Sequence, residues 1–212
     1  PIQGESGILP ATQEYLQAAR RLCDEHGALL ILDEVQTGMG HTGKLFAYEH
    51  YGITPDILSS AKALGGGFPI GAILATDKIA PTFGPGTHGS TFGGNPMACA
   101  VGSRAFDIIN TPETLAHVEK QGQKLQTTLR ELGDKTGVFK EVRGMGLLIG
   151  CVLVDQYKGR ASEITAAALK HGLMVLVAGA DVVRFAPSLL LNDEDMAEGL
   201  KRLEAALTEW LV

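Results

Sequence analysis

Lys62 is the residue in this sequence whose type and surroundings most directly suggest chemistry. It follows Ile57–Ala61 (ILSSA) and precedes Leu64–Gly67 (LGGG), so its neighbours are apolar or small. Burial among such residues would lower the pKa of the amine, as a lysine that forms a Schiff base requires. The glycines would let the backbone approach a bound cofactor closely. The alternative interpretation is a solvated surface residue, which is what a lone lysine after a strand usually is.

A second candidate is Asp33, which together with Glu34 directly follows the apolar run Ala28–Leu32 (ALLIL). A carboxylate buried at the end of a strand needs a partner, because an unpaired buried charge is costly. A protonated pyridine nitrogen is one such partner, and a pyridine ring kept protonated acts as an electron sink in carbanion chemistry. A helix-cap or loop carboxylate is the other interpretation, and these residues alone do not identify the partner.

The polar, glycine-rich segment Thr87–Asn95 (THGSTFGGN) precedes a predicted helix. Its hydroxyl groups and backbone N–H groups lie before a helix N-terminus, which is a suitable place to bind an anion. An ordinary turn and helix cap explains the same residues about equally well.

The segment Gly38–Gly43 (GMGHTG) matches the G-x-G-x-x-G pattern of dinucleotide-binding sites. In such a site the strand runs straight into the first glycine and a helix begins at once. Here Asp33–Thr37 intervenes, and Gly43 and Lys44 lead into an aromatic-rich segment. We therefore expect a turn at the rim of a cofactor site. The NAD alternative predicts no Schiff base and no dependence on Lys62.

Alternating helices and strands must position these residues, because functional groups in open α/β sheets gather beyond the carboxyl ends of strands. Apolar runs predict strands at Ala28–Leu32, Asp56–Ser60, Pro69–Ala75, Leu147–Leu153, Leu173–Val177 and Val182–Ala186. Helical spacing and capping residues predict helices after Thr12, over Pro96–Ile109, after Thr111, over Ala161–His171 and from near Asn192. The wholly apolar run Ala28–Leu32 suits a strand buried on both faces of a parallel sheet. The helix Pro96–Ile109 is predicted to have one apolar face, formed by Met97, Val101, Ala105 and Ile108.

The size and composition of the chain indicate one large domain or two modest ones, since 45% of the 212 residues are hydrophobic. A boundary near Asn110–Pro112 predicts that residues 1–110 form part of an open α/β domain and residues 111–212 a smaller α/β domain. The net charge of −6 argues against a nucleic-acid or anionic-membrane surface. No apolar run reaches the roughly 20 residues that a membrane span needs.

The three cysteines, Cys23, Cys99 and Cys151, have no zinc-ligand or redox spacing. They indicate reduced thiols in a cytoplasmic protein, and we expect no metal site. No signal peptide is recognisable. The chain begins at Pro1 without a methionine, so we expect a preceding segment, with any targeting signal, to be missing from this sequence.

Four motifs, in order along the chain, resemble the signatures of the class III aminotransferases. They are Gly4-Glu5 within PIQGESG, Leu32–Gly38 (LDEVQTG), Ala61–Pro69 (AKALGGGFP) and Gly89–Pro96 (GSTFGGNP). The resemblance continues through Arg143–Gly146 (RGMG) and Val183–Pro187 (VRFAP), so it covers essentially the whole chain. Within the family it is to the acetylornithine and succinylornithine type. It implies the α/β fold of type I PLP-dependent transferases, with part of the large cofactor-binding domain in residues 1–110 and the small C-terminal domain in residues 111–212.

The resemblance implies pyridoxal 5′-phosphate (PLP) as the cofactor and a role for each matching residue. Lys62 would bind PLP covalently and then shuttle a proton between the reacting carbon of the substrate and the C4′ carbon of the cofactor. Asp33 would pair with the pyridine nitrogen. Val35 would pack on a face of the ring, and Gln36 would lie near the phenolic oxygen.

The resemblance also implies a homodimer with shared active sites, in which Thr91, with Ser90 nearby, would bind the cofactor phosphate of the neighbouring subunit. Glu5 and Arg184 resemble a gating pair. Arg184 would bind a carboxylate of 2-oxoglutarate or glutamate, and Glu5 would neutralise it when the ω-amino substrate is bound. The implied reaction, in arginine metabolism, moves the ω-amino group of N-acetylornithine or N-succinylornithine to 2-oxoglutarate, giving the semialdehyde and glutamate.

The sequence departs from the family at two positions and lacks one large part. His41 stands where arginine is usual, and Ser6 where glycine is common. The N-terminal half of the family, which supplies a phosphate loop, an aromatic ring stacked on the cofactor and further substrate contacts, is absent from these residues. An isolated half would expose apolar surface. The alternatives are another class III reaction, such as transamination of ornithine or 4-aminobutyrate or an aminomutase reaction, and an inactive or non-catalytic fragment that only dimerises or binds the cofactor.

Overall fold

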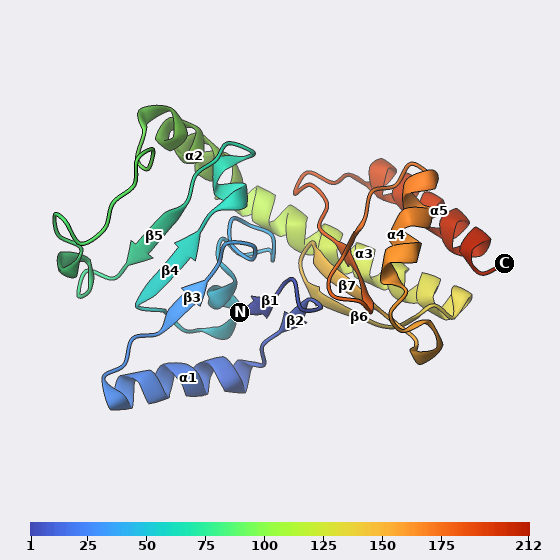
Figure 1. Ribbon diagram of the computed structural model, residues 1–212, viewed down its shortest axis with the longest axis horizontal. Coiled ribbons are helices and arrows are strands. Elements are labelled where there is room, and N and C mark those ends of the chain that lie inside the picture. Colours follow the sequence, from blue (N-terminus) through green and yellow to red (C-terminus); the bar gives the residue numbers. More distant parts are fainter. The chain divides into compact units, whose positions relative to one another are not determined.

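Contacts within the chain divide it into two units in the computed structural model, which describes residues 1–212 (Figure 1). The first unit comprises Pro1, Ala11–Gly40 and Lys44–Leu115, and the second comprises Ile2–Pro10, His41–Gly43 and Ala116–Val212. Two short segments from the N-terminal part of the chain therefore belong with the C-terminal part. The assignment of residues 1–110 and 111–212 to a large and a small domain stays a prediction.

A three-stranded sheet with the strand order β3-β4-β5 organises the first unit. β3 and β4 run parallel, and β5 runs antiparallel to β4. The elements of this unit are α1 (Gln13–His26), β3 (Ile31–Asp33), β4 (Ile57–Ser60), β5 (Ala72–Ala75) and α2 (Pro96–Ile109). α1 begins at the predicted cap Thr12, whose side chain accepts a hydrogen bond from the Tyr15 N–H. It ends at Gly27 with φ +65°, a conformation in which glycine is favoured.

The prediction of a doubly buried strand at Ala28–Leu32 is wrong. β3 spans only Ile31–Asp33, and the side chains of Leu29 and Ile31 are 45% and 60% exposed. β3 is an edge strand with β4 as its one neighbour. The N–H of Leu30 donates to the Asp56 carboxylate at 2.8 Å and so does not join the ladder. Ala28–Leu32 is therefore apolar in sequence, but several of its side chains are not buried within this unit.

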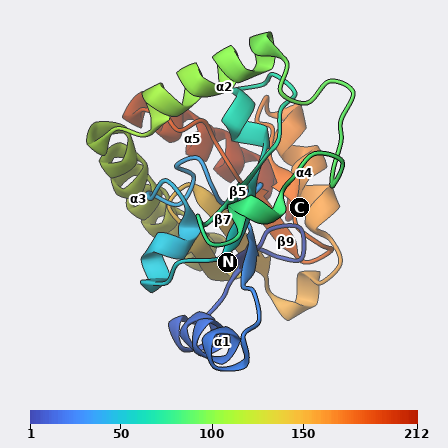
Figure 2. The same ribbon diagram turned by 90° about the vertical axis from the view of Figure 1, so that its left-hand side faces the viewer.

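A four-stranded antiparallel sheet with the order β6-β7-β9-β8 organises the second unit. Its elements are β1 (Ile2–Gln3), β2 (Leu9–Pro10), α3 (Pro112–Thr136), β6 (Phe139–Met145), β7 (Leu148–Leu153), α4 (Ala161–Lys170), β8 (Leu176–Val177), β9 (Val182–Phe185) and α5 (Asp193–Trp210). α3 starts in the first unit and continues into the second. α4 packs against α5 and β9 (Figures 1 and 2).

Every residue of β7 is buried, because both faces of the sheet are covered. Ile149 and Cys151 belong to the main core, with apolar residues of α3 and α5. Leu148 and Val152, on the opposite face, pack with Ile2 of the β1–β2 hairpin. Side chains alternate between the faces of a strand, so one short strand contributes to both layers.

Two strands of this sheet differ from the predicted ones. β6 has no predicted counterpart, because its sequence (FKEVRGM) is polar and its pairing with β7 is irregular between Phe139 and Glu141. The predicted strand Leu173–Val177 is reduced to the two residues of β8. None of the helices combines the length and the apolar character needed to cross a bilayer.

Candidate functional site

Lys62 and Asp33 follow the carboxyl ends of two neighbouring parallel strands. Asp33 is the last residue of β3 and pairs in register with Ser59 of β4. The Ser59 hydroxyl donates to the Asp33 carboxylate at 3.5 Å, a long hydrogen bond. Lys62 comes shortly after β4 ends at Ser60. The sheet thus presents an amine and a carboxylate beyond the same edge, where open α/β sheets bind their ligands.

The backbone of Lys62 is in an unusual conformation. Its φ angle is +49°, one of three such values at non-glycine residues of this chain. A non-glycine residue in this left-handed region costs on the order of 1–3 kcal/mol and persists only where its surroundings impose it. Lys62 starts a 3₁₀ turn, Lys62–Gly65, which ends when the Gly66 N–H donates to Ala63 O. Such local strain is concentrated at functional sites in proteins.

Helix α2 supports this turn through small residues. Ala98 and Gly102 are its buried residues, and α2 packs against the turn Lys62–Gly65. A Cβ atom on Gly102 would lie 3.5 Å from Leu64 O of the turn and 3.3 Å from the nearby Ile70 Cδ1. Met97 and Ile108, on the predicted apolar face, are exposed in this chain, so α2 buries smaller residues beside that face. The turn comes so close that only small side chains fit between it and the helix.

The expected burial of Lys62 and of Asp33 is also wrong for this chain. Both side chains are exposed. Lys62 lies among glycines and small residues that cover little of it, and Asp33 ends an edge strand. The Asp33 carboxylate also accepts a hydrogen bond from the Val35 N–H at 2.9 Å, which holds it in a local turn. Val35 and Gln36, in the same turn, are half-buried.

The buried carboxylate of this region belongs to Glu34, which sequence reasoning did not assign to the site. Its side chain is 1% exposed. It accepts hydrogen bonds from the Thr37 hydroxyl, from the Ala47 N–H at 3.1 Å and from the Tyr48 N–H at 2.8 Å. Burial, and secondarily the Glu34 charge, raises the pKa of Tyr51. Glu34 thus fixes the turn from which Asp33 projects. The E-x-x-T spacing of Glu34 and Thr37 is the sequence signal that predicts this contact.

The Thr87–Asn95 loop is exposed and closes on itself before α2. The Ser90 hydroxyl accepts a hydrogen bond from the Gly93 N–H at 2.8 Å, and Asn95 Oδ1 accepts one from the Ala98 N–H at 2.9 Å. Asn95 is thus the N-cap of α2. The side chain of Thr91 is exposed. This geometry fits a turn and helix cap, and a phosphate site at Ser90 and Thr91 stays a prediction.

The Gly38–Gly43 segment contains no strand or helix. Met39 and Gly40 have φ angles of +56° and +86°, and the Gly40 N–H donates to Leu45 O at 3.2 Å. The strand–glycine–helix order of a dinucleotide site is absent, and the segment is a turn, as the sequence predicts.

Glu5 and Arg184 form an ion pair in the second unit, although 179 residues separate them in the sequence. Arg184 Nη1 lies 3.3 Å from Glu5 Oε2. The Arg184 side chain is 13% exposed and the Glu5 side chain 82% exposed. The buried Arg184 Nε has no hydrogen-bond partner. A fixed, mostly buried cation therefore faces a carboxylate that is free to move into solvent.

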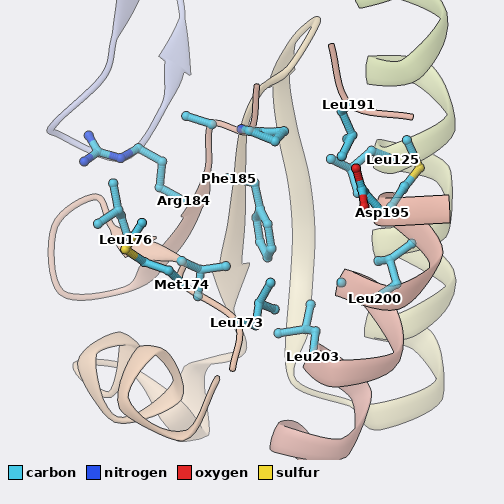
Figure 3. Close-up of a pocket in the computed structure, with 15 residues that line it drawn as sticks. Leu125, Leu173, Met174, Leu176, Arg184, Phe185, Leu191, Asp195, Leu200 and Leu203 are labelled. Atoms are coloured by element: carbon cyan, nitrogen blue, oxygen red, sulfur yellow. The ribbon is translucent and has the colours of Figure 1, made fainter. Parts of the chain in front are cut away.

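An apolar cavity of about 190 Å³ lies in the second unit, beside the edge strand β8. The Phe185 side chain points into it, whereas the guanidinium group of Arg184 points away from it (Figure 3). Leu125, Leu200 and Leu203 line the opposite wall (Figure 3). The Arg184 stem thus lines this cavity without placing the charged group in it.

No group of three or more His, Cys, Asp or Glu side chains is arranged to bind a metal ion.

An amine and a carboxylate beyond parallel strand ends, with a left-handed lysine, are features of a cofactor-binding transferase, and the comparisons define the class. The family model described as Aminotransferase class-III matches residues 1–207. This chain belongs to the class III aminotransferases and has the α/β fold of PLP-dependent transferases. Enzymes of this family depend on PLP. The residues fit that cofactor, because an amine can bind its aldehyde and a carboxylate can pair with its ring nitrogen.

The relatives that resemble this chain have related names. It is 84% identical over 210 residues to an acetylornithine aminotransferase of Neisseria meningitidis serogroup B, covering 99% of this chain and 53% of that protein. It is 57% identical to a succinylornithine transaminase/acetylornithine aminotransferase of Pseudomonas aeruginosa, of which it covers 52%. The crystal structure of N-acetylornithine aminotransferase from Stenotrophomonas maltophilia superposes with a TM-score of 0.92 at 47% identity, covering all of this chain and 55% of that one. The chain thus spans about half the length of these relatives.

Proposed function

We propose that the full-length protein containing this chain is a PLP-dependent aminotransferase. It transfers the ω-amino group of N-acetylornithine or N-succinylornithine to 2-oxoglutarate, giving the semialdehyde and glutamate. The observation that carries the proposal is the left-handed backbone of Lys62 beyond β4, next to the strand that ends in Asp33. The relatives, at up to 84% identity, are named as acetylornithine and succinylornithine aminotransferases, which supports an acylated ornithine as the amino donor.

PLP, when bound, supplies an electron sink for the carbanion formed at the reacting carbon. Lys62 Nζ would hold the cofactor until the substrate amine displaces it, and the freed lysine amine would then move the proton to and from that carbon. Asp33 would keep the ring nitrogen protonated, and the hydrogen bond that its carboxylate accepts from the Val35 N–H would orient it for this task. Val35 would pack on the ring of the cofactor, and Gln36 would lie near its phenolic oxygen.

The Glu5–Arg184 pair lets one pocket accept two substrates of different charge. With Glu5 3.3 Å from Arg184, the two charges cancel, which suits the ω-amino substrate. When 2-oxoglutarate or glutamate binds, its carboxylate replaces Glu5 on the guanidinium group. The Glu5 side chain can move into solvent without being desolvated, since it is already 82% exposed.

The active protein is a homodimer in which Ser90 and Thr91 bind the cofactor phosphate of the partner subunit. Both residues lie on an exposed loop, next to Phe92, which is 81% exposed. Ile31 and Ile73 of the first sheet are exposed apolar residues in this chain, a surface that the rest of the full-length protein would cover. The protein works in a reducing, cytoplasmic compartment, which the three free cysteines support.

The test is the absorbance spectrum of the full-length protein with PLP, after the mass of the polypeptide has been checked. A visible band that borohydride traps on Lys62, and that Lys62→Ala lacks, is the expected result. Assays with acetylornithine, succinylornithine, ornithine and 4-aminobutyrate then rank the donors. Absence of the band in the full-length protein would refute the aminotransferase proposal. A band without turnover of either acylated ornithine would refute the substrate assignment alone.

A further inference from the structure

Arg143 of β6 binds the backbone of the loop that carries Glu5. Arg143 Nε and Nη2 both donate to the carbonyl oxygen of Gly7, at 3.0 and 2.7 Å. Two N–H groups of one guanidinium edge therefore converge on a single acceptor, which a lysine ammonium cannot reproduce. The remaining Nη1 binds the exposed Glu141 at 3.1 Å. The Arg143 side chain itself is only 21% exposed.

The same loop is anchored at its other end by Ile8. The Ile8 N–H donates to Gly4 O at 3.3 Å, which closes residues 4–8 into a turn. Ile8 is fully buried and has a φ angle of +52°, a rare conformation for a β-branched residue. A Cβ atom on Gly150 of β7 would lie 3.0 Å from Ile8 Cβ, so the contact with the sheet is tight. The backbone on both sides of Glu5 is thereby fixed.

Gly7 is required where Arg143 approaches the loop. Its φ angle is +113°, and a Cβ atom there would lie 2.9 Å from Arg143 Nη2. On the other side of the ion pair, Arg184 belongs to β9, which is hydrogen-bonded to β7 and β8 and so is an interior strand. Within this arrangement, the exposed Glu5 side chain is the part that can move.

We propose that Arg143 is a positioning residue for the choice between the two substrates. By fixing the Gly4–Ile8 backbone, it confines the switch to the Glu5 side chain and keeps the paired state with Arg184 populated. The inference rests on the proposed function, in which the paired state accepts the ω-amino substrate. If the loop loosens, Glu5 samples positions farther from Arg184. Recognition of the amino donor then weakens, while recognition of the dicarboxylate does not.

The experiment compares Arg143→Gln with the wild type in the full-length holoenzyme. KM is measured separately for acetylornithine and 2-oxoglutarate, and amide hydrogen exchange is followed at residues 4–8. We expect KM for acetylornithine to rise roughly tenfold, the effect of losing a charge-assisted hydrogen bond. KM for 2-oxoglutarate stays the same or falls, and kcat changes by less than about twofold, because Lys62 and its surroundings are untouched. Exchange becomes faster at residues 4–8.

Two further variants separate this role from a structural one. Glu141→Gln removes only the exposed partner of Arg143 and should match the wild type in both KM values. Arg143→Lys keeps the positive charge but cannot place two N–H groups on the Gly7 carbonyl oxygen, so it should give a KM for acetylornithine between those of the wild type and Arg143→Gln. If Arg143→Gln does not fold, Arg143→Lys takes its place in the comparison.

The proposal is overturned if the two KM values rise together, if neither changes, or if exchange at residues 4–8 is unaltered. A wild type without aminotransferase activity would instead refute the proposed function. The exchange measurement would then still decide whether Arg143 holds the loop.

Discussion

Replacing Glu34 by glutamine tests whether its buried carboxylate holds the turn that presents Asp33. Glu34 Oε2 accepts from the Thr37 hydroxyl and the Ala47 N–H, and Oε1 accepts from the Tyr48 N–H. Glutamine has the same shape but one acceptor oxygen. If that oxygen takes the place of Oε2, the amide NH₂ group faces the Tyr48 N–H, and two donors oppose each other.

The cost follows from these three contacts. An unsatisfied buried donor costs about 1–3 kcal/mol. The two bonds that remain lose their charge assistance, which roughly halves their strength. We therefore expect Glu34→Gln to lower the free energy of unfolding by about 2–4 kcal/mol. Glu49→Gln is the matched control, because Glu49 is exposed and accepts one hydrogen bond, from the Phe46 N–H at 2.8 Å. Its effect should stay below about 1 kcal/mol.

The assay is urea unfolding of the full-length protein without PLP, together with PLP affinity by equilibrium dialysis. Glu34→Gln should also weaken PLP binding, because Asp33 and Val35 lose their fixed turn, whereas Glu49→Gln should not. Equal effects of the two substitutions on stability, or unchanged PLP affinity in Glu34→Gln, would refute this account of the buried carboxylate.

Two other substitutions test the first unit. The hydrogen bond from the Leu30 N–H, and after it the one from Arg20, holds the pKa of the Asp56 carboxyl group below its usual value. Ionised Asp56 therefore stabilises the fold above about pH 4, and this contribution is lost as the pH falls through the pKa of the folded state. Asp56→Asn should therefore be less stable than the wild type in urea unfolding at pH 7, and the difference should shrink below pH 4. Gly102→Val places a branched side chain where a Cβ atom would already lie 3.5 Å from Leu64 O of the turn and 3.3 Å from Ile70 Cδ1. It should push α2 off the Lys62 turn and weaken PLP binding at least about tenfold in equilibrium dialysis.

Matched controls exist for both substitutions. Asp24 also pairs with Arg20, at 2.7 Å, but its side chain is 65% exposed, so Asp24→Asn should show almost no pH-dependent difference. A difference for Asp56→Asn that persists unchanged at pH 3 would contradict the assigned linkage. Ser103 is an exposed neighbour of Gly102 on α2. If Ser103→Val weakens PLP binding as much as Gly102→Val does, contact with the turn is not the cause.

Local signals in the sequence predicted the helices well, because a cap is formed by residues close together in the chain. The predicted helix Pro96–Ile109 coincides with α2, whose Asn95 cap and Pro96 start are read directly. The face that α2 buries could not be read in the same way. The turn Lys62–Gly65 decides it, and that turn selects Ala98 and Gly102 over the larger Met97.

The candidate site was predictable to a similar extent. Lys62 and Asp33 were found because both follow strands of one parallel pair, a relation that the order of motifs reveals. Their exposure was not predicted, because burial depends on residues beyond those that follow each other in sequence. The contact of Arg143 with Gly7 spans 136 residues and leaves no periodic signal in either segment.

The membership of Ile2–Pro10 in the second unit has a consequence for the order in which the chain folds. During synthesis the Glu5 loop leaves the ribosome long before β7, against which Ile8 packs, and β9, which carries Arg184. Contacts that are distant in sequence form slowly, since a long loop must close first. The β1–β2 hairpin therefore stays unpacked until the sheet that contains β7 has formed, because Ile2 and Ile8 pack against residues of β7. A nascent chain stopped before β9 would have Glu5 but not Arg184, so the Glu5–Arg184 ion pair would be among the last contacts of this unit to form.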